Sequence, residues 1–443
     1  MIGLSACIVS AAFGQGVRLQ IGDDILVSEG PPGMQLIEPH LAAHPSRQNQ
    51  LLAVGWAYPE GLDERRPRDE YCVVFRSTDG GATWSEHSLD NVACADPWIA
   101  MTEDRATLTM MGTAASLTDT LDAGGQLIAF FSADGGTKWN PNPQGMGANH
   151  DGPRTTVARD GTIYLTSGQA WTYGTDRELR FSVFVGRARS DERHFYTVGR
   201  LHPSSLNLNA DGLAVLSDGT LVITYSDFQR KVEGRGFRSR AGALEKRRTW
   251  AIRSEDAGET YSLPLMVTED CYSRPTFLAV DTSSTSYRDR LYHVCPGEDL
   301  KSILLMYSSD RAEEWTVGTA IEAPAAEAGS RREPQIAVNS HGVVVVAWMD
   351  RRDDPSGVCY APYITASSDG GQTFSDPQRV ASEISCPYPE RVGVAGRRWP
   401  TGGDYFGLAA DAAGTFHMIW PDARAGTFAL RSAAISVAVT DED

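Results

Sequence analysis

The sequence predicts an all-β chain built as a seven-bladed β-propeller, with a six-bladed ring as the alternative. Two observations predict it: a turn motif that occurs six times, and seven strand-opening turns that follow one another with a long, nearly regular period. A third observation, a strand-like segment ahead of the first repeat, indicates how the ring closes. At 443 residues, without a Ser/Gly-rich linker or a low-complexity tract, the chain is expected to form one domain.

The turn motif is an Asp followed five residues later by an aromatic residue. Its six copies are Asp79/Trp84, Asp134/Trp139, Asp191/Tyr196, Asp256/Tyr261, Asp310/Trp315 and Asp369/Phe374. In five copies a Ser precedes the Asp by two positions, and in four a Gly follows it by two. The carboxylate can accept hydrogen bonds from nearby backbone amides, the Gly supplies a positive φ, and the aromatic packs between neighbouring sheets. The motif therefore predicts a structural turn between two strands.

The strand-opening turns set the period of the repeat. They are Glu38-Pro39, Asp96-Pro97, Asp151-Gly152-Pro153, Asp211-Gly212, Arg274-Pro275, Glu333-Pro334 and Asp404-Tyr405-Phe406. Successive openings lie 56 to 72 residues apart, which suits one four-stranded sheet with its loops. Inside a repeat, an apolar run, an Asp-Gly turn and a second apolar run predict a hairpin, as at residues 155–165. No stretch with helical periodicity competes with these strands, so no helix is expected.

The last repeat, from Tyr405 to about Val439, lacks the Asp turn and is one strand short. Residues 17–28 precede the first opening and are rich in Val, Ile and Leu, as strands are. We expect this N-terminal strand to pair with the last blade and close the ring, because closure removes the exposed sheet edges that promote aggregation.

The motif Ser-x-Asp-x-Gly-x-Thr-Trp at Ser77–Trp84, nearly repeated at Ser367–Phe374, resembles the Asp box of the sialidase-like (BNR-repeat) superfamily. The segments Gly403–Leu408 and Trp420–Arg424 are similar to those of its bacterial secreted members. The resemblance implies an Asp-box propeller. It does not fix the activity, since the same fold serves sialidases, other glycosidases, polysaccharide lyases and noncatalytic binding proteins.

The N-terminus predicts export. Residues 2–13 are apolar and Ala12-Phe13-Gly14 matches a signal-peptidase site, although the usual basic start is missing. We therefore expect a signal peptide over 1–14, a propeller domain over 15–443, and a secreted or periplasmic protein. Nothing else in the sequence is long and apolar enough to span a bilayer.

The cysteines agree with an oxidising compartment. Apart from Cys7 they form three close pairs, Cys72/Cys94, Cys271/Cys295 and Cys359/Cys386, and the predicted strand order places all three at one face. Three disulfides are expected. Six buried free thiols are the alternative, and the spacing does not favour a metal site.

The strand openings also place polar residues at the mouth of the central channel, where the innermost strands of a propeller begin. Paired carboxyl groups can act as acid and base or nucleophile, and arginines can hold an anionic sugar by bidentate hydrogen bonds. We assign catalytic roles to Glu333, Asp404, Tyr405 and Asp151. We assign substrate binding to Arg154, Arg274, Arg332, Glu38, Asp96 and Asp211. The alternative is that acids before Pro only cap turns.

The resemblance to sialidases covers little of this site. Those enzymes use three arginines, a Tyr nucleophile assisted by Glu, and an Asp acid/base, with the first arginine in an Arg-Ile-Pro motif. Here Ile37-Glu38-Pro39 stands at the corresponding opening, so that arginine is absent. Arg332-Glu333-Pro334 keeps the Arg-x-Pro spacing in the sixth repeat, so only Arg332 carries over by motif.

The charge distribution bears on the substrate. The chain has a net charge of −17, yet residues 230–248 contain eight basic residues against two acidic ones. A basic loop on an acidic body attracts anionic sugars and disfavours nonspecific nucleic-acid binding, although a merely solvated loop is the alternative.

The sequence thus predicts a secreted glycoside hydrolase, exo-sialidase-like, acting on an anionic glycan as a monomer without a cofactor. Two other classes stay open. A polysaccharide lyase would use His150 or Tyr173 as its base, and a noncatalytic propeller would only bind a glycan or a protein.

Overall fold

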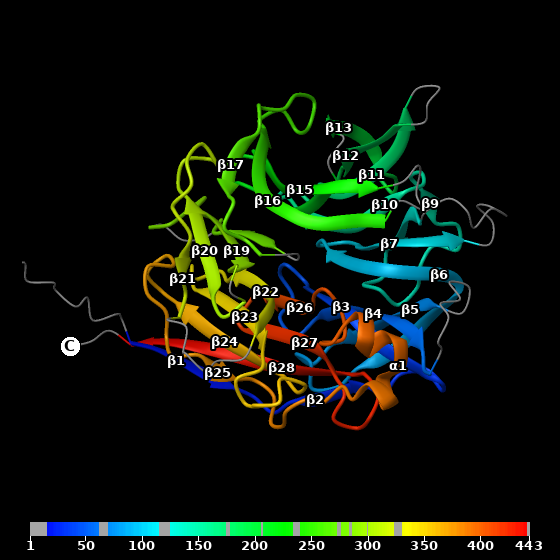
Figure 1. Ribbon diagram of the computed structural model, residues 1–443, viewed down its shortest axis with the longest axis vertical. Helices are drawn as coiled ribbons and strands as arrows, with labels where there is room; N and C mark the ends of the chain where they lie inside the picture. The colour runs from blue at the N-terminus through cyan, green and yellow to red at the C-terminus, as the bar shows by residue number, and fades with distance from the viewer. Residues whose placement is uncertain are drawn as a thin grey trace, which may run out of the picture.

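The computed structural model describes residues 16–61, 70–114, 125–173, 178–204, 207–233, 240–272, 276–282, 286–298, 300–322 and 330–440. Over these ranges the chain is all-β and antiparallel, with a single helix, α1 (Pro389–Arg398). Figure 1 shows the sheets following one another around the molecule in chain order, so that the blue strand β1 lies beside the red strand β28.

The first two repeats share one seven-stranded sheet. Its strands, in order, are β3 (Met34–Ala43), β4 (Leu51–Pro59), β5 (Tyr71–Ser77), β6 (Ser85–Met101), β7 (Ala106–Ala114), β8 (Gln126–Ser132) and β9 (Gln144–Gly145). The long strand β6 joins the two halves, because its first part pairs with β5 and its later part with β7.

Four further sheets each contain four strands in chain order. The first two comprise β10 (His150–Val157), β11 (Ile163–Tyr173), β12 (Glu178–Ala188) and β13 (Tyr196–Ser204), then β14 (Asn207–Val215), β15 (Leu221–Glu233), β16 (Arg240–Ser254) and β17 (Leu265–Thr268). The next two comprise β18 (Phe277–Val280), β19 (Leu291–Pro296), β20 (Ile303–Ser308) and β21 (Thr319–Ala320), then β22 (Arg331–Val338), β23 (Val344–Asp350), β24 (Ala361–Ser367) and β25 (Gln378–Arg379).

The last sheet contains both ends of the described chain. Its strands are β1 (Gly16–Ile21), β2 (Ile25–Ser28), β26 (Gly407–Ala410), β27 (Phe416–Asp422) and β28 (Ala429–Thr440). Both β1 and β2 pair with β28, so the N-terminal segment supplies the strand that the last repeat lacks, as expected. Between them, the Asp24 carboxylate accepts hydrogen bonds from Ser382 and Arg424 at 2.9 Å and from Arg431 at 3.1 Å.

The first strands of the repeats contact one another in a closed circuit that runs β3, β6, β10, β14, β18, β22, β26 and back to β3. Because β6 continues unbroken from the first repeat into the second, the described strands form six sheets. The count of seven blades therefore stays a prediction, whereas the all-β antiparallel architecture is confirmed.

The Asp turns form as predicted in five copies. In each, the Ser hydroxyl donates to the Asp Oδ1 at 2.7 or 2.8 Å. The backbone N–H four residues beyond the Asp donates to the same oxygen at 2.8 to 3.0 Å. Where Gly stands two residues after the Asp, its φ lies between 83° and 93°, which a side chain would strain.

The copy at Asp191 corrects the sequence prediction. Tyr196 is 54% exposed, whereas its neighbour Phe195 is 3% exposed and packs in the core against Phe131. No Ser stands two residues before this Asp. Instead the buried Arg105 guanidinium donates to the carbonyl oxygens of Gly161 and Arg189 at 3.0 and 2.8 Å. An arginine from the preceding repeat therefore holds this turn together with the Glu192 carboxylate, which accepts the Arg189 N–H at 2.7 Å.

Helix α1 was not expected from the sequence. It lies in the connection from β25 to β26. It begins at Pro389 and ends with Arg397 and Arg398, and a proline in the first turn and basic residues in the last turn favour a helix. Gly393, with a φ of 59°, interrupts it. Because this break leaves only two short helical turns, the sequence shows no sustained helical periodicity there. Its buried residues pack with Trp56, Tyr58 and Trp399.

Replacing Trp84 with Ala is expected to lower the free energy of unfolding by about 3 kcal/mol, because the ring fills a gap between the first and last repeats. The ring packs against the apolar cluster that contains Leu51 and Leu430, and its Nε1 donates to Gly81 O at 3.1 Å and to Ser432 Oγ at 3.3 Å. Urea unfolding measures the effect. The exposed Tyr196→Ala is the matched control, with an expected change below about 0.5 kcal/mol. Equal midpoints for the two variants would contradict the packing role.

The three predicted disulfides are present. They join Cys72–Cys94, Cys271–Cys295 and Cys359–Cys386, with Cα–Cα distances of 5.4, 5.7 and 4.2 Å. Such bonds are typical of oxidising compartments. The predicted signal peptide, including Cys7, lies outside the described residues. Among the helices that the structure describes, none has the length and apolar character of a membrane span.

Candidate functional site

Five of the seven predicted strand openings are β-bulges in the described part of the chain. The pairing register shifts at Ile37/His40, Ala95/Trp98, Asp151/Arg154, Ala210/Gly212 and Arg332/Gln335. In four of them the residue before the proline or the turn has a positive φ, namely Glu38 and Asp96 at 48°, Glu333 at 49° and Gly152 at 57°. A positive φ costs a non-glycine residue about 1 kcal/mol or more, and such strain is typical of functional sites. Three acidic residues are thus held where Gly would fit with less strain.

Glu38 and Asp96 form a pair of interacting carboxyl groups. Glu38 is 1% exposed, and burial, together with the charges of Asp96 and Asp404, raises the pKa of its carboxyl well above the usual value. Burial also raises the pKa of Asp96, with a further contribution from Asp151. The hydrogen bond between Glu38 and Asp96 raises the pKa of Glu38 and lowers that of Asp96, so a proton resides mainly on Glu38.

Asp404 and Asp151 are the exposed acids of the group. The Asp404 backbone N–H donates to Glu38 Oε1 at 3.3 Å, and the charge of Asp404 raises the pKa values of Glu38, Asp96 and Glu333. The charge of Asp151 likewise raises the pKa of Asp96. The fold therefore gathers acids from five repeats, which are Glu38, Asp96, Asp151, Glu333 and Asp404.

Glu333 holds a proton to unusually high pH. Burial raises the pKa of its carboxyl to about 8, against the opposing effects of the Thr401 hydroxyl and the charges of Arg332 and Arg351. The Thr401 hydroxyl donates to Glu333 Oε2 at 2.9 Å. A carboxylic acid that stays protonated near neutral pH can donate a proton in catalysis.

The variant Glu333→Gln is expected to change the pH dependence of stability. In the parent, a pKa raised from 4.5 to about 8 favours the folded state fully below about pH 4.5, and this contribution is lost as the pH rises towards 8. Gln keeps the acceptor for Thr401 and carries no charge. Thermal melts should therefore give the same midpoint as the parent near pH 4.5 and a higher midpoint near pH 8.5. The exposed Glu60→Gln should change neither value, and an equal effect at both pH values would contradict a Glu333 carboxyl that stays neutral up to about pH 8.

Arg154 and Tyr405 are part of an aromatic box. The Arg154 Cζ lies 4.3 Å from the centroid of the Trp98 ring, 4.9 Å from that of Tyr405 and 5.6 Å from that of Phe277. The Tyr405 hydroxyl donates to Pro97 O at 3.0 Å, and burial raises its pKa well above the usual value. Both side chains are buried. In this arrangement Tyr405 is a neutral packing partner and has no exposed oxygen for nucleophilic attack.

The remaining predicted residues have other partners or lie outside the described residues. The buried Asp211 carboxylate pairs with Arg247 at 3.3 Å and accepts a hydrogen bond from Ser226. The His150 Nδ1 lies 2.7 Å from Ser167 Oγ and its Nε2 lies 3.0 Å from Gln169 Nε2, while burial lowers its pKa to about 4. Arg274, the side chain of Tyr173, and most side chains of the basic loop at 230–248 lie outside the described residues.

The sequence analysis missed three residues of the site. The His40 ring stacks on Trp98 with centroids 3.6 Å apart, and its Nδ1 accepts the Ile99 N–H at 3.2 Å. Burial and the charge of Arg154 hold its pKa well below the usual value. Thr401 and Arg351 stand beside Glu333. Only His40 had a signal in the sequence, because it follows Glu38-Pro39 directly.

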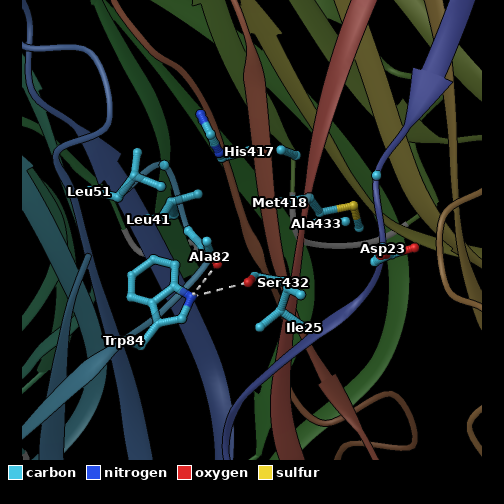
Figure 2. A pocket seen from close by; sticks show the side chains of 14 residues that line it. Asp23, Ile25, Leu41, Leu51, Ala82, Trp84, His417, Met418, Ser432 and Ala433 are labelled. Carbon is cyan, nitrogen blue, oxygen red and sulfur yellow. Dashed lines mark hydrogen bonds between the residues drawn. The ribbon is translucent and has the colours of Figure 1, made fainter. Parts of the chain in front are cut away.

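Two pockets lie at the end of the molecule where the Asp turns are. One of about 230 Å³, between the first and last repeats, is lined by residues that include Trp84, Leu41 and His417 (Figure 2). Another of about 390 Å³ lies between the first two repeats beside Arg105. Neither is lined by any of the gathered acids. We place the candidate site at the acids, because carboxyl groups from five repeats, three of them at strained backbone positions, interact there, whereas the charged side chains of the second pocket, such as Glu103, Asp104 and Asp134, belong to turns between strands.

Within the described part of the chain, no group of three or more His, Cys, Asp or Glu side chains is arranged to hold a metal ion. The gathered acids can supply both a protonated carboxyl and an ionised carboxylate. Their surroundings hold the pKa values of Glu333 and Glu38 above the usual range.

Comparison with known proteins supports the repeat and the fold. The family model of the BNR/Asp-box repeat matches residues 75–86, which contain the turn at Asp79, so the resemblance to the sialidase-like superfamily is confirmed at that motif. No curated protein matches the chain. A solved protein of unknown function from Dyadobacter fermentans DSM 18053 is 11% identical with a TM-score of 0.55, over 95% of this chain and 99% of that one, which shows a shared fold.

Two glycosidases are also similar in structure. The Hadza microbial sialidase Hz136 is 12% identical with a TM-score of 0.48, over 95% of this chain and 92% of that one. The α-L-arabinanase of Penicillium chrysogenum is 12% identical with a TM-score of 0.45, over 74% of this chain and 94% of that one.

Proposed function

We propose that this Asp-box protein is a glycoside hydrolase whose active site is the group of acids at the strand openings. The observation that carries the proposal is the contrast within that group. Glu333 holds its proton up to about pH 8, while Asp404 beside it is exposed. Glycoside hydrolysis requires one carboxylic acid and one carboxylate on either side of the scissile bond.

In the proposed mechanism Glu333 is the acid that protonates the leaving oxygen, and Asp404 is the base or nucleophile. Asp151, the other exposed acid, acts electrostatically on Asp96 and is proposed to assist. Tyr405 supports Arg154 through the aromatic box and has no direct chemical step. Asp211 is left out of the substrate-binding set, because its carboxylate is engaged by Arg247.

We further propose an anionic glycan as the substrate, cleaved in an exo-sialidase-like manner. A proton on Glu333 and another on the Glu38–Asp96 pair remove negative charge from the site, which leaves Arg332, Arg351 and Arg154 with fewer opposing carboxylates. Arg332 is half-buried beside Glu333 and would bind a substrate carboxylate bidentately. Arg274, to which the sequence assigns substrate binding, would bind the same carboxylate.

The finer architecture and the location belong to the same proposal. The seven first strands that contact in a circuit support seven blades, with the two halves of the β3–β9 sheet counted separately. Three disulfides support a secreted or periplasmic protein with a signal peptide over 1–14, and we propose that it acts as a monomer.

A screen of the purified protein against sialosides, uronate polysaccharides and neutral glycans tests the function. Release of a sugar from an anionic glycan supports the proposal. A product that absorbs in the ultraviolet would instead indicate an elimination, for which His150 is poorly suited because Ser167 and Gln169 occupy both ring nitrogens. Binding without turnover would favour a noncatalytic propeller.

A further inference from the structure

A short segment, residues 401–405, carries Asp404 into the site, and two glutamates from different repeats hold it. At one end Thr401 donates its hydroxyl hydrogen bond to Glu333 Oε2 at 2.9 Å. At the other end the Glu38 backbone N–H donates to Gly402 O at 2.9 Å, and the Asp404 N–H donates to Glu38 Oε1 at 3.3 Å. These two bonds of Glu38 are made to the backbone of the segment that bears Asp404, while its carboxyl also bonds to Asp96.

The segment approaches Glu38 so closely that only glycine fits. A Cβ added at Gly403 would lie 2.5 Å from Glu38 Cγ and 3.0 Å from Glu38 Cα, and the φ of Gly403 is 148°. A Cβ at Gly402 would lie 2.3 Å from Pro421 Cβ. The backbone is therefore confined on both sides, and the Glu38 side chain forms one of the walls.

We infer that Glu38 is a positioning residue that fixes Asp404 in the site and does not itself contact the glycan. The inference rests on the proposed function of Asp404. Glu38 is 1% exposed, which leaves its carboxyl no surface for a sugar, whereas Asp404 is exposed. The strained φ of 48° at Glu38 is what directs its backbone N–H to Gly402 O while its side chain accepts from Asp404. The sequence had suggested substrate binding for this residue.

The chain itself offers a variant that is expected to fold. In the second repeat the same bulge carries Asp96, with the same φ of 48°, so Asp is tolerated at this backbone conformation. Glu38→Asp keeps the carboxyl group and shortens the side chain by one methylene, which withdraws the acceptor from the Asp404 N–H. Glu38→Gln keeps the length and an acceptor oxygen, and serves as the matched control.

Amide hydrogen exchange of residues 402–405, followed by mass spectrometry, is the first measurement. Exchange in Glu38→Asp is expected to be at least about tenfold faster than in the parent, with Glu38→Gln close to the parent. Gly403→Ala, which presses on Glu38 from the other side, should loosen the same peptide with Glu38 intact. Unchanged exchange in both Glu38→Asp and Gly403→Ala would overturn the inference.

Kinetics on a glycan that the parent cleaves is the second measurement. Because misplacing a catalytic group by about 1 Å costs on the order of a hundredfold, kcat of Glu38→Asp should fall by that factor while KM changes by less than about threefold. Glu38→Gln should retain most of kcat. A raised KM with unchanged kcat and exchange would show that Glu38 binds the sugar and would overturn the inference. If the parent cleaves no glycan, the proposed function fails, and the exchange result still decides whether Glu38 positions the segment.

Discussion

Asp404→Asn is expected to lower kcat by a factor of about 10² to 10⁴ on whichever glycan the parent cleaves, because the variant removes the base or nucleophile from the group of acids. The amide has the same shape, and the backbone N–H that reaches Glu38 Oε1 is unchanged. Because the variant also removes a charge that repels the neighbouring carboxyl groups, the melting temperature should not fall below that of the parent. Steady-state kinetics with a melting curve for each variant measures both effects.

Arg332→Ala separates binding from chemistry in the same experiment. Removal of the arginine should weaken binding of an anionic glycan by about 2 to 4 kcal/mol, because a desolvated carboxylate loses its partner, and should affect neutral glycans little. Glu60→Gln, an exposed acid away from the group, serves as the control. If Asp404→Asn and Arg332→Ala both kept the parent's kinetics, the active site would have to lie elsewhere.

Asp24→Ala is expected to lower the free energy of unfolding by about 3 to 5 kcal/mol, the usual cost of breaking a buried ion pair from one side. The Asp24 side chain is 8% exposed and contacts Arg424 at 2.9 Å and Arg431 at 3.1 Å. Its loss removes one partner from each guanidinium group, of which Arg424 keeps Asp422 at 2.8 Å, and removes a side-chain link between the N-terminal segment and the last repeat. Denaturant unfolding measures the change.

Asp23→Ala is the matched control for that experiment, since Asp23 is the exposed neighbour and should change stability by less than about 0.5 kcal/mol. The pH dependence gives a second check. Burial alone would raise the pKa of Asp24, but hydrogen bonds from Ser382 and the charge of Arg424 lower it overall. The stabilisation is therefore present above the ordinary aspartate pKa and is lost as the pH falls through the lowered value. Equal acid sensitivity of the parent and Asp24→Ala would contradict the role of this carboxylate.

Features that depend on neighbouring residues in the sequence were predictable. The Asp turns follow from the Ser, Asp and Gly of one short segment, and each disulfide joins cysteines separated by 22 to 27 residues. The exception at Tyr196 arises because Arg105, far away in the sequence, bonds to the carbonyl oxygens of this turn. Helix α1 escaped prediction because Gly393 interrupts its period.

The site was predictable only in part. Five of the six acids at the strand openings interact with one another, because the first strands of successive repeats contact one another. Asp211 and Glu38 have the same local context, an acid at a strand opening. One pairs with Arg247 and the other with the Asp404 segment. Partners that distant, and the burial that separates the pKa values, follow from the tertiary structure and leave no local signal.

The seam between β1 and β28 has a consequence for how the molecule reaches its folded state. Residues 16–21 pair with residues 435–440, so a chain made from its N-terminus holds β1 without a partner until nearly all other strands exist. Contacts between such distant residues form slowly, and an unpaired edge invites association with other chains meanwhile. We expect docking of the two ends to be the last step of folding, and the same seam to be the first place where the ring opens under force or heat.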